Sequence, residues 1–285
     1  MFFTELSSVC LMLNAVLSGR PQDLKKLKRY QYERYAVLCK VTYQTDFDPQ
    51  SLGFSTDNYA EIANRWGHIC ARVLWRDDHP EVLVVFRGSQ TVNEWLINLL
   101  CMPKVKQFSH CRYHVHYGYD YLLEQMSNPT APNYQADQSI FQRLHAIVSP
   151  LILLGKRVTL TGHSSGGAMA ILAADRLERQ YTKSIKRVVT FGQPAPGFGS
   201  FQRQYLLHRR TYRICCGVDV VTFLPPLPGM FHHVGRMLWL HNERIYDNIS
   251  PVKRFLLSFA SWLLSPFASH YMHKYIRDKD FFDDL

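Results

Sequence analysis

Apolar runs alternate along the chain with segments of helical periodicity. The runs are rich in β-branched residues and predict buried strands at 81–87, 157–161, 187–191 and 211–216. The first run contains five consecutive apolar residues, Val82 to Phe86, so we expect it near the centre of a sheet. Apolar residues at helical spacing predict helices at 22–43, 139–154 and 166–180. This alternation indicates an α/β fold, with a largely parallel central sheet covered by helices on both faces.

Weaker patterns complete this picture. A strand at 69–75 precedes the 81–87 strand, and the turn-forming residues 76–80 between them predict a hairpin. Short helices are expected at 119–126 and 198–207, and a helical tail at 266–278. Residues 237–240 and 244–246 predict a terminal hairpin. With 285 residues and no repeat or low-complexity stretch, we expect a single domain over 1–285.

The formal net charge of +10 narrows the set of partners only slightly. A nucleic-acid binder concentrates its basic residues in a recognisable module, and none is found here, so no nucleic-acid partner is expected. Contact with anionic lipid surfaces or release of anionic products would suit the positive charge. Solubility and chance account for it equally well.

The cysteines and the N-terminal residues are the features of the sequence that bear on the cellular location of the protein. They do not determine that location. The seven cysteines form an odd number, and the adjacent pair Cys215 and Cys216 would point to opposite faces of a strand. This pattern suits free thiols, and residues 1–17 make a poor signal peptide because they lack a basic start and contain Glu5. The cytoplasm is slightly favoured, and secretion stays open.

Neither a metal nor a membrane span is expected. Cys111, His114 and His116 are conceivable metal ligands, but no second ligand pair accompanies them. The most apolar segment, 255–267, is shorter than a transmembrane helix requires. We therefore predict no metal, no other cofactor and no transmembrane segment.

The motif that points most strongly to catalysis is the pentapeptide Gly162-His163-Ser164-Ser165-Gly166, a G-x-S-x-G. It lies between a predicted buried strand and a helix of small residues. A serine on such a tight turn has strained backbone angles, and the glycines two residues before and after it let the strand and helix approach. The turn exposes the Ser164 hydroxyl and directs the first amides of the helix towards a ligand.

An activated serine needs a base, and that base needs an orienting acid. Asp219 follows the predicted 211–216 strand, at the edge where parallel sheets bind ligands, although a turn or helix-capping role explains it about as well. Five histidines follow it in the chain. His270 comes after an apolar segment and near anchoring tyrosines, and His273 is its main competitor. Local chemistry does not decide between the two.

These motifs together resemble the class 3 lipases, the filamentous-fungal type of triacylglycerol lipase in the α/β-hydrolase superfamily. The matching segments, in order, are 84–89 (VVFRGS), 116–119 (HYGY), 162–168 (GHSSGGA), 189–194 (VTFGQP), 219–226 (DVVTFLPP), 233–235 (HVG), and His270 followed five residues later by Tyr275. The resemblance covers about residues 59–278 and implies the α/β-hydrolase fold.

The resemblance implies a role for each matching residue. Ser164 would be the nucleophile, Asp219 the acid and His270 the base, since the family's last histidine stands in a short motif ending in tyrosine. The oxyanion hole would use the backbone N–H of Ser165 and a donor at Ser89, from its N–H or its hydroxyl. His233 and His116 match structural positions of the family.

The resemblance also places a helical lid at about residues 90–103. The apolar residues of this segment share one helical face: Val92, Trp95, Leu96, Leu99 and Leu100. An ordinary core helix has the same pattern, but a lid would cover the serine in water and open at a lipid interface. The family often has an acidic residue near the end of the lid, where this chain has Asn98, so a salt-bridge latch is in doubt.

The function we expect is hydrolysis of acylglycerol esters through an acyl-enzyme, with lipid esters and the lipid–water interface as partners. Alternatives of the same fold are a phospholipase A1 or a short-chain carboxylesterase. A catalytically inactive lipase-like interaction module is the alternative from another class. An apolar acyl slot is expected from Leu224, Pro225, Leu227 and Met230, with 256–267 at its rim. The oligomeric state is left open.

Overall fold

The computed structural model describes residues 29–277, except 91–99, 109, 129–137, 218, 228, 242–243, 251, 255 and 257–268. Its main sheet has eight strands in the order β1-β2-β3-β6-β7-β9-β11-β12. They are β1 (Tyr59–Ala63), β2 (Ile69–Trp75), β3 (Glu81–Phe86), β6 (Arg157–His163), β7 (Ile185–Phe191), β9 (Thr211–Cys216), β11 (Arg236–His241) and β12 (Arg244–Asp247).

The five central strands, β3 to β11, pair in parallel, and the outer pairs are antiparallel. Short connections explain the antiparallel edges, because a tight turn reverses the chain whereas a parallel crossover needs about a dozen residues. The predicted hairpins β2–β3 and β11–β12 are both confirmed. The expected largely parallel sheet is confirmed for the centre of the molecule.

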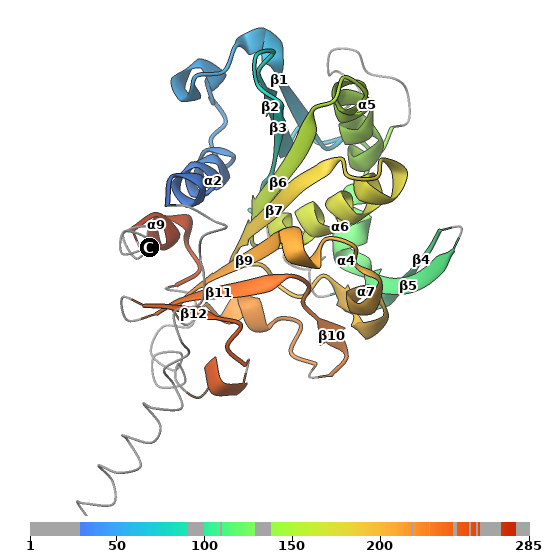
Figure 1. The fold of residues 1–285 in the computed structure, drawn as a ribbon, viewed down its shortest axis with the longest axis vertical. Helices are drawn as coiled ribbons and strands as arrows, with labels where there is room; N and C mark the ends of the chain where they lie inside the picture. The colour runs from blue at the N-terminus through green and yellow to red at the C-terminus, as the bar shows by residue number, and fades with distance from the viewer. Residues whose placement is uncertain are drawn as a thin grey trace, which may run out of the picture.

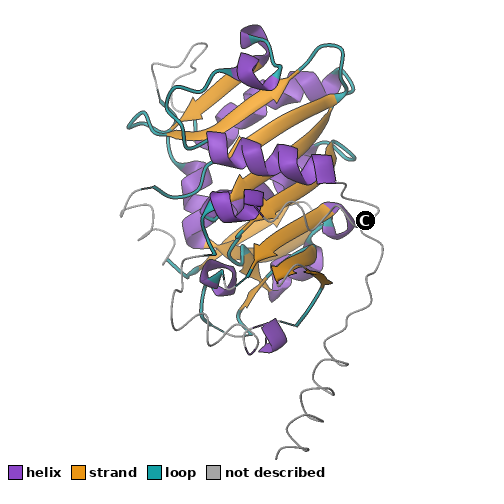
Figure 2. Cartoon of the chain, turned by 90° about the vertical axis from the view of Figure 1, so that its left-hand side faces the viewer, coloured by secondary structure: helices purple, strands orange, loops and turns teal. Residues whose placement is uncertain are grey.

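Helices cover both faces of this sheet, as predicted (Figure 1). On one face lie α4 (Tyr117–Glu124), α5 (Ile140–Leu153) and α6 (Ser165–Gln180), and on the other lie α2 (Arg29–Val41) and α9 (Met272–Arg277). Figure 2 shows helices lying across the strands on this second face. Two buried apolar clusters follow from this layering, one on each side of the sheet.

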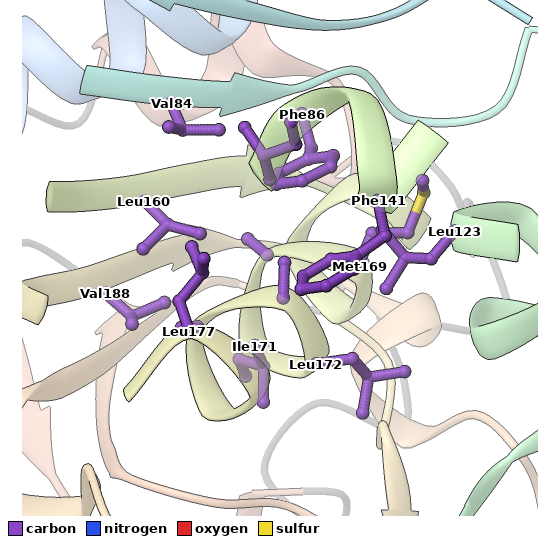
Figure 3. Close-up of a cluster of buried hydrophobic side chains, with 14 of the residues drawn as sticks. Val84, Phe86, Leu123, Phe141, Leu160, Met169, Ile171, Leu172, Leu177 and Val188 are labelled. Atoms are coloured by element: carbon purple, nitrogen blue, oxygen red, sulfur yellow. The ribbon is translucent and has the colours of Figure 1, made fainter. Parts of the chain in front are cut away.

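Helix α6 fills the larger cluster and positions the site (Figure 3). Ile171, Leu172 and Leu177 of its predicted apolar face belong to the same buried cluster as Val84 of β3 and Leu160 of β6, and Leu177 lies beside Leu160. The alanines 168, 170, 173 and 174 are fully buried as well. Small side chains allow close approach of the helix to the sheet, so α6 is held firmly at its N-terminal end, where the serine lies.

A second, four-stranded sheet was not expected. It pairs β10 (Phe231–His232), β8 (Gly197–Phe198), β5 (Cys111–His116) and β4 (Pro103–Phe108) in that order. Strand β4 carries two lysines and is mostly exposed. Such a polar edge strand has little of the apolar pattern by which buried strands are recognised.

Other boundaries differ by a few residues from the sequence-based predictions. The helix expected at 198–207 is shorter, because Gly197–Phe198 belongs to β8 and α7 spans only Gly199–Gln204. Helix α5 begins after Ser139, which forms a capping box with Gln142. Pro150 lies inside this helix, as predicted. Short 3-10 helices occupy Pro49–Leu52 (η1), Thr56–Asn58 (η2), His208–Arg210 (η3) and Val220–Phe223 (η4).

Candidate active site

Ser164 lies on the sharp turn between β6 and α6, with φ 57° and ψ −133°. A Cβ on Gly162 would come within 2.4 Å of the Gly166 carbonyl oxygen, and one on Gly166 within 2.5 Å of the Arg87 carbonyl oxygen. Only glycine fits both positions, so the close approach expected from the pentapeptide is present. The positive φ at Ser164 is the strained conformation that such a turn demands.

Three side chains far apart in sequence meet at this turn. Ser164 Oγ lies 3.0 Å from His270 Nε2, and His270 Nδ1 lies 2.9 and 3.0 Å from the two carboxylate oxygens of Asp219. Because a carboxylate only accepts, Nδ1 carries the proton and Nε2 accepts from the serine hydroxyl. The structure therefore brings all three predicted residues into one hydrogen-bonded chain.

Exposure separates the two candidate histidines. His270 is 8% exposed and lies in the hydrogen-bonded chain with Ser164 and Asp219. His273 is exposed and stacks on Tyr271 at 5.7 Å between ring centroids. Of the two, only His270 is placed to accept a proton from Ser164.

Asp219 is both the catalytic candidate and a helix cap. It follows β9 and precedes η4, whose Val221 N–H donates to Oδ1 at 3.1 Å. The Tyr275 hydroxyl donates to Oδ2 at 2.5 Å, and a Cβ on Gly192 would lie 2.5 Å from that oxygen. The capping role and the orienting role are therefore compatible, because one carboxylate accepts from several donors.

His163, next to the serine, is held between two further groups. Its Nε2 lies 2.6 Å from the backbone oxygen of His270, and its Nδ1 lies 2.8 Å from the Tyr43 hydroxyl. Since a carbonyl only accepts, Nε2 carries the proton and the tyrosine donates to Nδ1. Burial, with a further contribution from the nearby His270, holds the pKa of His163 well below its usual range. A neutral imidazole thus links Tyr43 to the backbone of His270.

The two predicted oxyanion donors lie side by side. Ser89 N–H donates to Ser165 Oγ at 3.1 Å, and the two hydroxyl oxygens lie 2.9 Å apart. The Ser165 N–H occupies the first position of α6, where backbone donors lack an intrahelical acceptor. In this structure the Ser89 amide is therefore engaged with Ser165, and the Ser165 side chain must turn away before that amide can reach a ligand.

The cavity at Ser164 has a volume of about 590 Å³. It is lined by Tyr43, Ser89, His163, Ser164, His270, Tyr271 and Met272. The expected acyl-slot residues Leu224, Pro225 and Leu227 line a different cavity, so that expectation is wrong for this structure. The two cavities share no lining residue.

Most of the predicted lid lies outside the described residues. Val92, Trp95, Leu96 and Leu99 fall in the 91–99 gap. Leu100 is described and is 38% exposed. Assignment of the lid to about 90–103 therefore stays a prediction.

The three conceivable metal ligands on β5 have other partners. Cys111 Sγ accepts from Arg179, His114 Nδ1 lies 3.2 Å from Ser200 Oγ, and His116 Nδ1 accepts from Gly118 N–H. Within the described ranges, no group of three metal-ligating side chains occurs. The six described cysteines are free thiols, and Cys215 and Cys216 pack on opposite faces of the sheet, as predicted.

Tyr43 and His163 are site residues that the sequence did not reveal. His163 belongs to the pentapeptide, yet its position alone gave no reason to assign it a contact. Tyr43 is 120 residues away from it, and no motif surrounds this tyrosine. The anchoring tyrosines near His270 were the only available signal of this kind.

The chain is similar in sequence to known lipases. A family model described as Lipase (class 3) matches residues 83–229. The secreted mono- and diacylglycerol lipase LIP4 of Malassezia restricta is 38% identical over 88 residues, which are 30% of this chain and 29% of that protein. The lipase of Rhizomucor miehei is 28% identical over 174 residues, covering 60% of this chain and 44% of that protein. The matched regions thus span less than half of these relatives.

Solved structures agree on the fold. A fungal lipase–inhibitor complex, described as a model for interfacial activation, is 22% identical with a TM-score of 0.56 and covers 74% of this chain and 79% of that chain. Lipase II from Rhizopus niveus is 18% identical with a TM-score of 0.54, over 74% and 80%. Among the described helices, none has the length and apolar character needed to cross a bilayer.

Proposed function

The chain belongs to the class 3 lipase family, and from this premise we propose that it is a serine-dependent lipase acting on acylglycerol esters. The predicted family and its α/β-hydrolase fold are confirmed. The observation that carries the proposal is the hydrogen-bonded chain from Ser164 through His270 to Asp219. This chain also argues against an inactive interaction module, which has no need of an aligned base and acid.

The geometry supports a two-step acyl transfer. His270 Nε2 takes the hydroxyl proton as Ser164 Oγ attacks the ester carbonyl, and Asp219 stabilises the imidazolium that forms. His270 then returns the proton to the leaving alcohol, which leaves an acyl-enzyme. Water, deprotonated by the same imidazole, hydrolyses the acyl-enzyme and releases the fatty acid.

The developing oxyanion would be stabilised by the Ser165 and Ser89 amides. Ser165 N–H is already oriented by the start of α6, whereas Ser89 N–H now donates to the Ser165 hydroxyl. We therefore include a rotation of the Ser165 side chain in the activation step. Removal of one such donor typically costs 10²–10³ in kcat.

The relatives narrow the substrate class. Several are named mono- and diacylglycerol lipases, so partial glycerides join triacylglycerol as first substrates to test. Phospholipase A1 and short-chain carboxylesterase activities are the alternatives of the same fold. Those relatives are also named as secreted, so the comparisons give a cytoplasmic location no support. We propose secretion as the location to test.

The proposal is tested by labelling and turnover together. A fluorophosphonate probe should label the parent protein and fail to label Ser164→Ala, with His273→Gln as a control that labels normally. The labelled parent should hydrolyse a diacylglycerol emulsion and a series of nitrophenyl esters. A parent that is labelled but prefers phospholipid over every glyceride is a phospholipase, and one that neither labels nor turns over any ester contradicts the proposal.

A further inference from the structure

A second cavity, of about 630 Å³, shares no lining residue with the one at Ser164. Its lining residues come from η4 and the segment after it, from β10, and from residues 248–250, 252 and 254. Most of its lining is apolar, including Leu224, Leu227, Phe231, Ile249 and Val252. Its volume is in the range of small-molecule sites, about 300–1,000 Å³.

Two buried arginines line this apolar cavity. Arg213 of β9 is 9% exposed, and Arg254 is 3% exposed. Arg213 Nε donates to the Val234 carbonyl, and Arg254 donates to Thr222 Oγ1 while its guanidinium lies 3.9 Å from the Phe223 ring centroid. No carboxylate of the described residues pairs with either arginine, and none lines the cavity.

A third buried arginine, Arg72, has all of its guanidinium nitrogens paired with acceptors. Arg72 is fully buried, and its three nitrogens donate to Glu61 and to the carbonyls of Val41 and Gln44. By contrast, Arg254 Nε has no partner among the described residues. A buried cation without a counter-ion is costly, and an anion that enters this cavity would supply the missing partner.

Arg213 keeps its charge at neutral pH. Burial, with a smaller contribution from the positive charge of Arg254, lowers the pKa of Arg213 to about 10. The neighbouring His233 stays neutral, because burial and then the charge of Arg213 hold its pKa well below the usual range. The cavity therefore presents two guanidinium groups in an apolar wall.

We propose that this second cavity binds a fatty acid, with its carboxylate at Arg213 and Arg254 and its chain along the apolar lining. Guanidinium groups match a carboxylate in geometry and charge. The apolar lining would exclude water from the chain. The choice of a fatty acid rests on the proposed function, whose product is a fatty acid, whereas the demand for an anion rests on the arginines alone.

The cavity is coupled to the catalytic acid by one short element. Thr222 accepts from Arg254 and donates to the backbone oxygen of Asp219 at 2.6 Å. Both contacts lie on or beside η4, whose N-cap is Asp219. Three hydrogen bonds, through Arg254 and Thr222, would therefore link a bound carboxylate to the backbone of Asp219, a position suited to product feedback.

Equilibrium dialysis of labelled decanoate, below its micelle concentration, tests the proposal on the full chain carrying Ser164→Ala. Two control ligands accompany it. Decanol has the same chain without the charge, and inorganic phosphate has negative charge without an alkyl chain. We expect decanoate to bind about 10- to 100-fold more tightly than decanol, the range that a charge-assisted hydrogen bond gives. Equal binding of decanol overturns anion recognition, and equal binding of phosphate overturns the role of the chain.

Variants locate the binding. Arg254→Met should weaken decanoate binding at least about 10-fold, Arg254→Lys should restore part of it, and the exposed Arg209→Met should change nothing. If Arg254→Met fails to fold by circular dichroism, Arg213→Gln takes its place, since its amide still reaches the Val234 carbonyl. Undiminished binding in the folded variant overturns the site. Ester hydrolysis by the parent is measured separately, so failure of the lipase proposal is seen on its own.

Discussion

At the scale of single residues, the neutral imidazole of His163 supports the proposed base, His270. His163 donates to the backbone of His270 and accepts from Tyr43, and the Tyr43 hydroxyl in turn accepts from Gly88 N–H at 3.1 Å. These bonds join the loop that carries Ser89 to His270, the proposed base. The same hydrogen bonds, through Tyr43 and His163, therefore orient both His270 and the loop that carries Ser89.

Removing the Tyr43 hydroxyl tests this support. Tyr43→Phe leaves two buried groups without a partner, which typically costs about 1–3 kcal/mol. We expect kcat for a soluble ester to fall about 10-fold with KM within about twofold, because orientation is lost and not substrate contact. Tyr271→Phe, in the same cavity, is the matched control. A rise in KM with unchanged kcat would assign Tyr43 to substrate binding.

Buried histidines make the fold sensitive to acid. Burial holds the pKa values of His163 and His233 well below the ordinary value of about 6.5, which the unfolded chain keeps. Below about pH 6.5 the unfolded state therefore binds more protons, and each histidine lowers the free energy of unfolding by up to about 1.4 kcal/mol per pH unit. This stability is present above pH 6.5 and is lost as the pH falls.

Urea denaturation between pH 7.5 and pH 5.5 measures this effect. His233→Gln keeps a donor for the Thr222 carbonyl but cannot titrate, so its stability should fall less steeply with acid, by about one proton. The exposed His273→Gln should follow the parent curve. Parallel curves for the parent and His233→Gln would mean that His233 protonates without cost in the folded state.

The roles of some site residues could be predicted from their neighbours in sequence, and those of others could not. The glycines at 162 and 166 were predictable, because the backbone contacts that exclude a Cβ arise within the strand–turn–helix itself. The place of Asp219 after a buried strand left a turn or capping role open, and its role as the acid followed only from the resemblance to the class 3 lipases. Tyr43 was not predictable, since only the folded chain brings it to His163.

At the scale of elements, Arg72 ties the end of α2 to the sheet. Its guanidinium on β2 donates to the carbonyls of Val41 and Gln44 at the end of that helix, and to Glu61 on β1. The carbonyls at a helix end lack intrahelical partners, so a side chain that satisfies two of them fixes where the helix stops. Helix α2 also leads to Tyr43, so this anchor positions a residue of the site.

Arg72→Met should be among the most destabilising substitutions in the described chain. It removes a buried cation whose three partners then lack a donor, at an expected cost of about 3–5 kcal/mol in the free energy of unfolding. Arg76→Met breaks an exposed ion pair with Asp78 and should leave the free energy of unfolding unchanged. Urea denaturation compares the two. A small loss for Arg72→Met would mean that α2 ends stably without it.

Elements were predictable where burial dictated their pattern. Strands β3, β6, β7 and β9 lie in the covered centre of the sheet, so their apolar runs stand out in the sequence. Strand β4 is an exposed edge, and its alternation of lysines with apolar residues resembles a loop as much as a strand. The second sheet was missed for this reason.

At the scale of the whole molecule, chain order predicted the fold but not the direction of every side chain. Strand, serine, acid and histidine in sequence imply one edge of a parallel sheet, and the structure has them there. The acyl slot expected from Leu224 and Leu227 is wrong, because these residues line a cavity that shares no residue with the one at Ser164. Their cavity became visible only in three dimensions.

A basic surface and an apolar rim together predict how the protein meets lipid. Leu227 and Val252, at the second cavity, are 42% and 70% exposed, and the chain has a net charge of +10. Exposed apolar side chains insert into an interface, while positive charge draws the protein to anionic lipid. We therefore expect tighter binding to vesicles containing anionic lipid than to neutral ones, with the difference shrinking as salt rises.

Vesicle sedimentation separates the two contributions. Leu227→Ser with Val252→Ser should weaken binding to neutral vesicles at least about 10-fold, because a buried apolar side chain contributes about 1.5–3 kcal/mol. Leu153→Ser, on α5, removes a leucine that is 77% exposed and should leave binding unchanged. If Leu153→Ser weakens vesicle binding as much as the double substitution does, any exposed leucine contributes to membrane binding and the second cavity has no special role. A loss confined to the first pair would mean that the lipid surface meets the molecule at the mouth of the second cavity, where a released fatty acid would be recaptured.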